Sequence, residues 1–514
     1  MPETNEADEA PSTPNAANTE IPKDPRGARA AVWTSSTYFA EGFPYTIVNG
    51  LPEMLFKEFG ASLESIGLTS LFHLPWNLKF LWGPFLDRFG TKRKWLLGVE
   101  VVLTALLFAL AAAVSGGNVL VAASVCFFAI AIAAATHDIA IDGYYLEALD
   151  EADQSRFVGT RATAYRIAML AASGPLVLLI GKVGWTYALL FGATTMGGLL
   201  LFHTRFLPRV ETETRPIREL LPLLATPTML GGVASLGAAI WVLWELAARG
   251  AAGTLPEPFA SIFGAVSFSG WLGLTLLAAL GAILLALPRI RTRMESSESF
   301  YAEAFVNFLA QDRIAVILGF VILFRAGESF LLKMRYAFLS DIGISIEQYG
   351  IASGTFGVIA SFVATIAAGW LISSGGLRKW IWPFVLGQNL LNLLYAVLAA
   401  HYAPLWLDPG SGSASMVVVT VTIIIESAGA GLGTAVFMVY LMRCCRPGYK
   451  AAHMAILTAL MSVSFTLAGV ASGFLATRLG FTNYFVFTFL TTIPGMLLIF
   501  RLPYLDSAPV AKTA

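Results

Sequence analysis

The sequence has 514 residues, of which 56% are hydrophobic and 13% are charged, and its mean hydropathy is +0.70. Soluble domains contain about 45 to 50% apolar and about 25% charged residues, so the composition excludes an ordinary soluble protein and predicts an all-α polytopic membrane protein. Lysines plus arginines number 33, as do aspartates plus glutamates, and this balance gives no indication of nucleic-acid binding. The three cysteines have neither disulfide-framework nor zinc-site spacing, and we expect no metal and no cofactor.

Residues 1–30 open the chain with an acidic stretch rich in proline, alanine and asparagine. They lack an apolar segment after a basic start, so they do not have the pattern of a secretory signal peptide. Their composition is typical of a disordered tail, which we place in the cytoplasm.

The rest of the chain is a succession of apolar segments. A hydrocarbon core of about 30 Å needs roughly 20 apolar residues per helix, and by that measure the sequence predicts about 14 spans. The first six lie near 33–55, 64–86, 95–114, 118–146, 158–181 and 184–203. Two extra spans follow near 228–247 and 262–287. The last six lie near 314–337, 349–372, 380–400, 415–441, 451–477 and 481–501.

The positions of the positive charges orient these spans. With the N-terminus inside, 25 of the 33 lysines and arginines fall on the cytoplasmic side, as the positive-inside rule requires. Six others, Lys333 and Arg335 among them, fall toward the opposite face. Both termini are therefore predicted to be cytoplasmic. The predicted domains are a tail, an N-terminal six-helix bundle, a linker with two extra helices, a C-terminal six-helix bundle and a second cytoplasmic tail, at 1–30, 31–205, 206–312, 313–503 and 504–514.

The two sets of six spans share short sequence patterns. KEFGASLESIG at 57–67 resembles LSDIGISIEQYG at 339–350, and RKW recurs at 93–95 and 378–380. Such repeated halves around a central path are typical of transporters. The alternative is that short loops of this kind recur by chance at membrane interfaces.

The fourth span carries the stretch AIAAATHDIAIDGYYLEAL at 131–149. Ionisable side chains inside a transmembrane helix are costly unless they face protein or water, so they mark a substrate or proton path. Asp138, Asp142 and Tyr145 are spaced by four and three residues and share one helix face. We predict that this face lines a transport cavity, with both aspartates coupling protons and Tyr145 contacting substrate.

A polar stripe in the first span adds to this set. Glu41, Tyr45 and Asn49 recur every four residues in an otherwise apolar segment, which favours a cavity face over a core face. We predict that Glu41 also couples protons and that Tyr45 and Asn49 contact substrate.

Two cations of the first half allow two interpretations each. Lys79 either extends to the cytoplasmic interface or faces the fourth-span aspartates or a substrate carboxylate. Arg166, near the start of the fifth span, either pairs with Asp142 across the bundle or anchors the helix at the membrane interface. For both we predict a substrate-binding role.

The second half contains a smaller set of polar candidates. Arg325 and Glu328 are three residues apart, so they either neutralise each other within one helix or offer the arginine fork to an anionic substrate. Glu426 lies within the tenth of the twelve core spans and is a fourth proton-coupling candidate. Asn389 is predicted to contact sugar hydroxyls.

The loop after the second span reads GPFLDRFGTKRKW at 83–95. Its Gly, Asp-Arg and Gly, followed by basic residues, resemble the loop signature of the major facilitator superfamily. The signature implies that Gly83 allows close helix approach and that Asp87 pairs with a cation or caps a helix, with Arg88 and Gly90 completing a gating motif. The alternative is a basic anchor alone.

Three longer stretches, FAEGFPYTIVNGLP at 39–52, LKFLWGPFLDR at 78–88 and ATHDIAIDGYYLEAL at 135–149, carry a closer resemblance. Together they resemble the AmpG-type muropeptide permeases and the acetyl-CoA transporters, which share a family. His137 stands where these relatives commonly have glutamine. The resemblance implies the major facilitator fold, with two six-helix bundles plus two extra helices.

The resemblance also implies a function. We expect a secondary active transporter of the bacterial inner membrane that imports anhydromuropeptides, GlcNAc-anhydroMurNAc with or without peptide, for cell-wall recycling. Proton coupling is predicted from the buried carboxylates. The alternative substrates are acetyl-CoA or another small organic anion, a siderophore or a drug. An integral membrane enzyme and a sensor that binds without transport are the alternatives from other classes. We expect a monomer whose partners are its substrate, protons and the bilayer.

Overall fold

The computed structural model describes residues 25–79, 82–209, 215–219, 222, 226–264, 270–275, 278, 286, 289, 300–402 and 414–506. Every regular element within these residues is a helix, and nine helices among them are long and apolar enough to cross a membrane. The predicted all-α membrane architecture is therefore confirmed. The count of about 14 spans stays a prediction, since most of 1–30 and much of the second extra span lie outside the described residues.

The first half of the chain forms one group of helices. Its long members are α1 (Pro25–Glu58), α5 (Lys92–Ala113), α6 (Val119–Ala148), α7 (Glu151–Ser173), α8 (Pro175–Val183) and α9 (Trp185–Phe206). The predicted second span is broken into α2 (Leu63–Leu68), η1 (Thr69–His73), α3 (Leu74–Leu78) and α4 (Gly83–Arg88). Prolines stand in the first turns of α3, α4 and α8, because a proline lacks the backbone N–H that an interior turn needs.

The second half repeats this plan. Its elements begin with α14 (Phe300–Leu309), α15 (Ile314–Leu323), α16 (Ala326–Asp341), α17 (Ile346–Tyr349), the π-helical segment η4 (Gly350–Gly357) and α18 (Val358–Gly375). They continue with α19 (Leu377–Leu391), α20 (Leu393–Tyr402), α21 (Met416–Arg443), α22 (Lys450–Leu490), α23 (Ile493–Leu498) and η6 (Ile499–Arg501). α22 contains two helices joined at Gly480, where φ is 69°, so the predicted break between 477 and 481 is present.

The repeated loops have the same local geometry. Gly60 and Gly343 both adopt positive φ, at 74° and 86°. Two residues later, Ser62 caps α2 by accepting a hydrogen bond from Ser65 N, and Ser345 caps α17 by accepting one from Gln348 N. The sequence similarity between these loops therefore corresponds to a structural repeat.

The elements between the halves lie at the edge of the molecule. They are η3 (Ile217–Glu219), α11 (Pro227–Ala251) and α12 (Phe259–Gly264). α11 contains the first predicted extra span, and its Trp241 and Trp244 are exposed. Exposed tryptophans on a membrane helix are typical of lipid and interface contacts.

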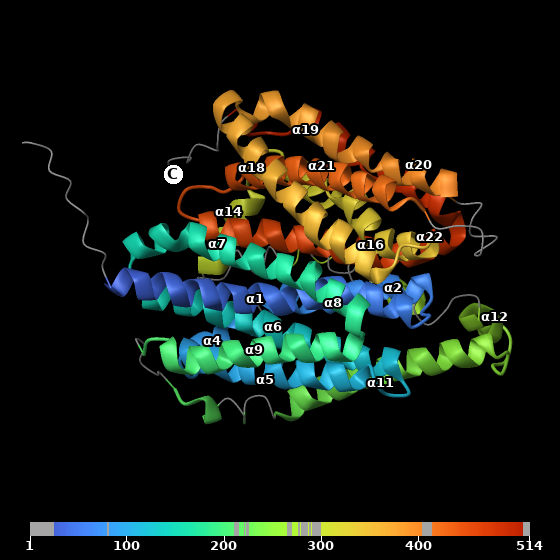
Figure 1. The fold of residues 1–514 in the computed structure, drawn as a ribbon, viewed down its shortest axis with the longest axis horizontal. Coiled ribbons are helices and arrows are strands. Elements are labelled where there is room, and N and C mark those ends of the chain that lie inside the picture. Colours follow the sequence, from blue (N-terminus) through green and yellow to red (C-terminus); the bar gives the residue numbers. More distant parts are fainter. Residues whose placement is uncertain are drawn as a thin grey trace, which may run out of the picture.

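The two groups of helices share a buried core toward one end of the molecule. Figure 1 shows the first half from blue to green on one side and α16 to α22 from yellow to red on the other, with α1 beginning at the left end. We call the opposite end, which carries the loops after α1 and α16, the distal end. One buried core joins residues of both halves, including Leu55 and Leu339. Two further cores belong to a single half each, around Tyr144 and Tyr440. The bundles are therefore joined by a shared core at the distal end, and each has a core of its own elsewhere.

Candidate functional site

The distal end is closed by direct contact between the bundles. Lys57 on α1 forms an ion pair of 2.5 Å with Asp341 on α16, and Tyr336 donates a hydrogen bond of 2.6 Å to Glu58. On the other side, Gly354 of η4 packs so closely on Ser173 of α7 that an added Cβ would lie 1.7 Å from its carbonyl oxygen. A glycine is therefore required at position 354 for this end to close.

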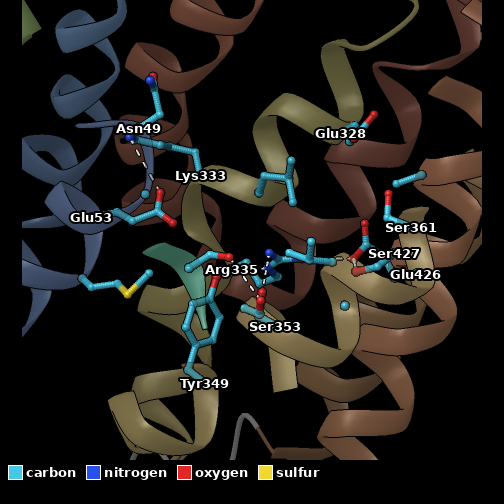
Figure 2. A pocket seen from close by; sticks show the side chains of 18 of the residues that line it. Asn49, Glu53, Glu328, Lys333, Arg335, Tyr349, Ser353, Ser361, Glu426 and Ser427 are labelled. Atoms are coloured by element: carbon cyan, nitrogen blue, oxygen red, sulfur yellow. Dashed lines mark hydrogen bonds and ion pairs between the residues drawn. The ribbon is translucent and has the colours of Figure 1, made fainter. Parts of the chain in front are cut away.

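Below this closure lies a cavity of about 270 Å³ between the bundles. Figure 2 shows charged and hydroxyl side chains converging on it from α1, α16, η4 and α21. Its polar lining comprises Asn49, Glu53, Ser173, Glu328, Lys333, Arg335, Tyr349, Ser353, Ser361, Glu426 and Ser427. Three predicted residues, Asn49, Glu328 and Glu426, are brought together here.

One wall of the cavity, which we call its C-terminal wall, comes from α16, α17, η4 and α21 of the second half. Arg335 occupies the centre of this wall. Its Nη1 donates to Glu426 Oε2 at 3.1 Å, its Nη2 to Ser353 Oγ at 2.7 Å and its Nε to the Tyr349 hydroxyl at 3.3 Å (Figure 2). Glu426 itself is only 1% exposed, so this is a buried ion pair. Ion pairs of this kind are costly to desolvate and are often kept for function.

Lys333, two residues earlier, links the bundles. Its ammonium donates to Thr69 Oγ1 at 2.6 Å and lies 3.8 Å from Glu53 Oε2 on α1. The prediction had assigned Lys333 and Arg335 to the far face by counting charges along a span. The structure places both inside the protein, because α16 is packed on all sides near its distal end. The signal was a pair of cations within an otherwise apolar predicted span.

Arg325 and Glu328 form the intrahelical pair that their spacing allows. Arg325 Nε and Nη2 contact the two Glu328 oxygens at 3.0 and 2.5 Å. Gln388 on α19 donates a third hydrogen bond to Glu328 at 3.0 Å. Its neighbour Asn389 is 1% exposed and lies outside the cavity lining. Substrate contacts by Arg325 and Asn389 stay predictions.

A second charged cluster lies in the N-terminal bundle, between α1, α6 and α7. Lys79 forms an ion pair with Asp138, so the cation faces the fourth span instead of only the interface. Asp142 accepts a hydrogen bond of 2.7 Å from the Tyr38 hydroxyl and lies 3.2 Å from Arg161 Nη2. Glu41 is close enough to both aspartates to interact electrostatically with them.

The arginine that pairs with Asp142 is Arg161 and not the expected Arg166. Positions 161 and 166 differ by five residues, about 140° around an α-helix, so only one can point to α6. Arg166 lies over the Phe362 ring at 5.1 Å, against the other bundle. The Arg161 guanidinium also lies 5.2 Å from the Tyr145 ring, whose hydroxyl donates to the Gln154 carbonyl.

Two residues of the polar stripe in the first span, Tyr45 and Asn49, contact the broken second span. Tyr45 packs edge-on against Trp76 at 5.1 Å. Asn49 Oδ1 is 2.8 Å from His73 Nδ1, and His73 Nε2 is 3.1 Å from Ser462 of the other bundle. Asn49 therefore takes part in a hydrogen-bonded bridge across the cavity.

His137 lies away from the aspartates. It is fully buried, with Nε2 3.4 Å from Glu100 Oε1, and His203 Nδ1 lies 2.6 Å from the same oxygen. Ser36 completes the network at 2.9 Å from His203 Nε2. These residues connect α1, α5, α6 and α9 within the N-terminal bundle.

The loop signature is partly explained by the structure. Asp87 pairs with Lys92, as expected of a residue that meets a cation. Gly90 N donates to the Arg215 carbonyl at 2.6 Å. Close helix approach is not the reason for Gly83, since a Cβ there would meet only Ile139 Cδ1 at 3.9 Å among the described residues. Gating by this motif, Arg88 included, stays a prediction.

Comparison with known proteins agrees with this architecture. Residues 35–168 match the family model described as acetyl-coenzyme A transporter 1. A POT family transporter in complex with 5-aminolevulinic acid superposes with a TM-score of 0.61 at 15% identity, over 92% of this chain and 96% of its own. The inward-open xylose transporter XylE from E. coli gives 0.56 at 12%, over 93% and 96%. The chain therefore shares the fold of these transporters.

Two relatives by sequence cover most of this chain. A protein from Haemophilus influenzae is 24% identical over 480 residues, which are 90% of this chain and 92% of that protein. The anhydromuropeptide permease of Escherichia coli K12 is 22% identical over 468 residues, 90% of this chain and 77% of its own. The predicted resemblance to the AmpG-type permeases and the acetyl-CoA transporters is therefore confirmed.

Proposed function

We propose that this protein is a proton-coupled secondary transporter that imports anhydromuropeptides by alternating access. The observation that carries the proposal is the cavity between two bundles that are fused at the distal end and lined there by buried, paired charges. In the predicted topology the distal end faces outward, so this conformation is open toward the cytoplasm. Rocking of one bundle against the other would expose the same cavity to the outside.

The N-terminal cluster supports proton coupling. Glu41, Asp138 and Asp142 face two cations, Lys79 and Arg161. Three carboxylates against two cations leave one negative charge unmatched, and a single bound proton would neutralise it. Proton exchange at this cluster would then accompany each change of conformation.

The cavity's chemistry supports a sugar–peptide substrate. Hydroxyl and amide groups of Asn49, Tyr349, Ser353 and Ser427 suit sugar and peptide polar groups, and the cations suit a carboxylate. The E. coli relative is named for anhydromuropeptides, which is the substrate class we carry over. We place the transporter in the bacterial inner membrane and expect a monomer.

The test is uptake of labelled GlcNAc-anhydroMurNAc into proteoliposomes under an inward proton gradient. Wild type should accumulate the label, and collapsing the gradient should abolish accumulation. The double variant Asp138→Asn, Asp142→Asn should lose accumulation, whereas Arg249→Gln, an exposed change on α11, should retain it. Gradient-driven uptake by the double variant at the wild-type rate would refute the coupling assignment. Binding without uptake by wild type would favour a sensor.

Acetyl-CoA is the second candidate, because the matched family model carries that name. The cavity argues against it: Lys333, Arg335 and Arg325 each already face a carboxylate, whereas coenzyme A brings several phosphate charges. Labelled acetyl-CoA in the same vesicles would decide between them. Its accumulation, with none of the sugar, would replace the proposed substrate.

A further inference from the structure

The cavity's C-terminal wall is a preassembled anion site around Arg335. Ser353 and Tyr349 hold two edges of the guanidinium independently of Glu426. These two residues belong to η4 and the end of α17, and π-helical segments within membrane helices are frequent at functional sites. The guanidinium would therefore keep its position if Glu426 released it.

Glu426 holds Arg335 through only one of its two oxygens. Oε2 accepts from Arg335 Nη1, but Oε1 is buried and has no hydrogen-bond partner among the described residues. An unsatisfied buried carboxylate oxygen is costly. Glu328 differs, because Arg325 contacts both of its oxygens. The Arg335–Glu426 contact is therefore incomplete, with one buried carboxylate oxygen unsatisfied among the described residues.

Charge balance then links an anion to a proton. The cavity region holds three carboxylates, Glu53, Glu328 and Glu426, and the three cations Lys333, Arg325 and Arg335. An anion that enters this balanced, buried set adds an uncompensated charge. A proton on Glu426 would both supply the compensation and free the Arg335 fork.

We propose that Arg335 binds the substrate carboxylate in place of Glu426, which takes up a proton as the substrate enters. The inference rests on the proposed function and deepens it by assigning the residue that recognises the acidic group. No covalent bond changes: one proton moves from solvent to Glu426, and Arg335 exchanges one carboxylate for another. The arginine fork suits a bidentate carboxylate better than the one-oxygen contact it now makes.

The experiment measures calorimetric binding of two ligands to the purified full chain. One ligand is GlcNAc-anhydroMurNAc with its free lactyl carboxylate, and the other is its neutral N-methylamide. The variants are Glu426→Gln, the double Arg335→Gln, Glu426→Gln, and the control Arg249→Gln, whose arginine is exposed. The double variant removes both charges, so no unpaired buried carboxylate remains to disturb folding.

Wild type and the Arg249→Gln control should prefer the acid over the amide by at least about tenfold, as expected for a charge-assisted bidentate contact. The double variant should bind both ligands equally. Glu426→Gln should keep the preference for the acid but lose gradient-driven accumulation in vesicles.

Two results would overturn the inference separately from the proposed function. A double variant that still prefers the acid as strongly as wild type would show that another residue binds the carboxylate. Loss of the preference in Glu426→Gln would show that Glu426 does not compete for Arg335. If wild type bound neither ligand, the proposed substrate and this inference would both fall.

Discussion

At the residue scale, the direction in which a side chain leaves its helix decides which partner a charge meets. Arg161 reaches Asp142, whereas Arg166 on the same helix lies against Phe362. Both arginines follow from the sequence as cations near the start of the fifth span. Their roles do not, because the rotation of α7 about its axis is set by packing against α1 and α6.

The two adjacent cysteines give a prediction at this scale. Cys444 and Cys445 follow the last residue of α21 and are buried. Burial raises the pKa of the Cys444 thiol to about 12 and that of Cys445 to about 11. The thiolate is the reactive form, so at pH 8 both should resist iodoacetamide in the folded protein and react after denaturation in SDS. Mass spectrometry measures this, and equal labelling in both states would contradict the burial.

Gly431 provides a second residue-scale prediction. A Cβ there would lie 2.2 Å from the Ser361 carbonyl oxygen on α18, a backbone atom that cannot move alone. Gly431→Ala should therefore lower the free energy of unfolding by about 1–3 kcal/mol. The measurement is thermal unfolding in detergent. Gly369→Ala is the matched control, since a Cβ at that α18 position meets no described atom within 4 Å. Equal melting temperatures for the two variants would exclude this tight contact.

At the element scale, two predicted spans are irregular where they pack against the other bundle. The second predicted span is divided into four short elements. The span predicted near 349–372, the eighth of the twelve core spans, contains the π-helical η4. Apolar length predicts a span in both cases but does not reveal these irregularities. Irregular backbone is tolerated at membrane depth where it is packed against protein or lines a cavity, which describes both segments.

The contact between η4 and α7 predicts the effect of a single methyl group. Gly354→Ala would place a Cβ 1.7 Å from the Ser173 carbonyl oxygen, so the distal end could not close as it does here. The equilibrium should shift toward a distally open state. Spin labels attached at Lys182→Cys and Arg478→Cys, both exposed positions, should lie farther apart. Double electron–electron resonance measures the distance between the two labels. An unchanged distance distribution, equal to that of Gly369→Ala, would refute the requirement for glycine at position 354 in distal closure.

At the scale of the whole molecule, the distribution of buried cores describes the conformation. One core crosses between the halves at the distal end, and two separate cores lie nearer the termini. Such an arrangement closes one entrance to the cavity and leaves the halves free to separate at the other. It is the arrangement that alternating access requires of one of its end states.

The orientation of the molecule gives the last prediction. Both described ends of the chain lie at the same end of the bundle (Figure 1), and the excess of lysine and arginine predicts that this end is cytoplasmic. Green fluorescent protein fused to the C-terminus should fluoresce, and alkaline phosphatase fused there should be inactive. An active phosphatase fusion, with expression verified, would invert the topology.

The sequence by itself determined the features that depend on local composition. Apolar length predicted the membrane helices, and the similarity of the stretches 57–67 and 339–350 indicated a repeat, which the caps at Ser62 and Ser345 confirm. Charges inside apolar segments identified Asp138, Asp142 and Glu426 as unusual, because hydrocarbon does not solvate them.

Only the tertiary structure decided which of these charges meet. Arg335, Lys333 and Glu53 converge on one cavity from α16 and α1, although Lys333 and Arg335 lie 280 and 282 residues after the glutamate in the chain. Their meeting depends on how two bundles pack, whereas charge counting along one helix predicts only that two of them lie toward the face opposite the cytoplasm. Ion pairing between distant helices is a property of that packing, so no local pattern could reveal it.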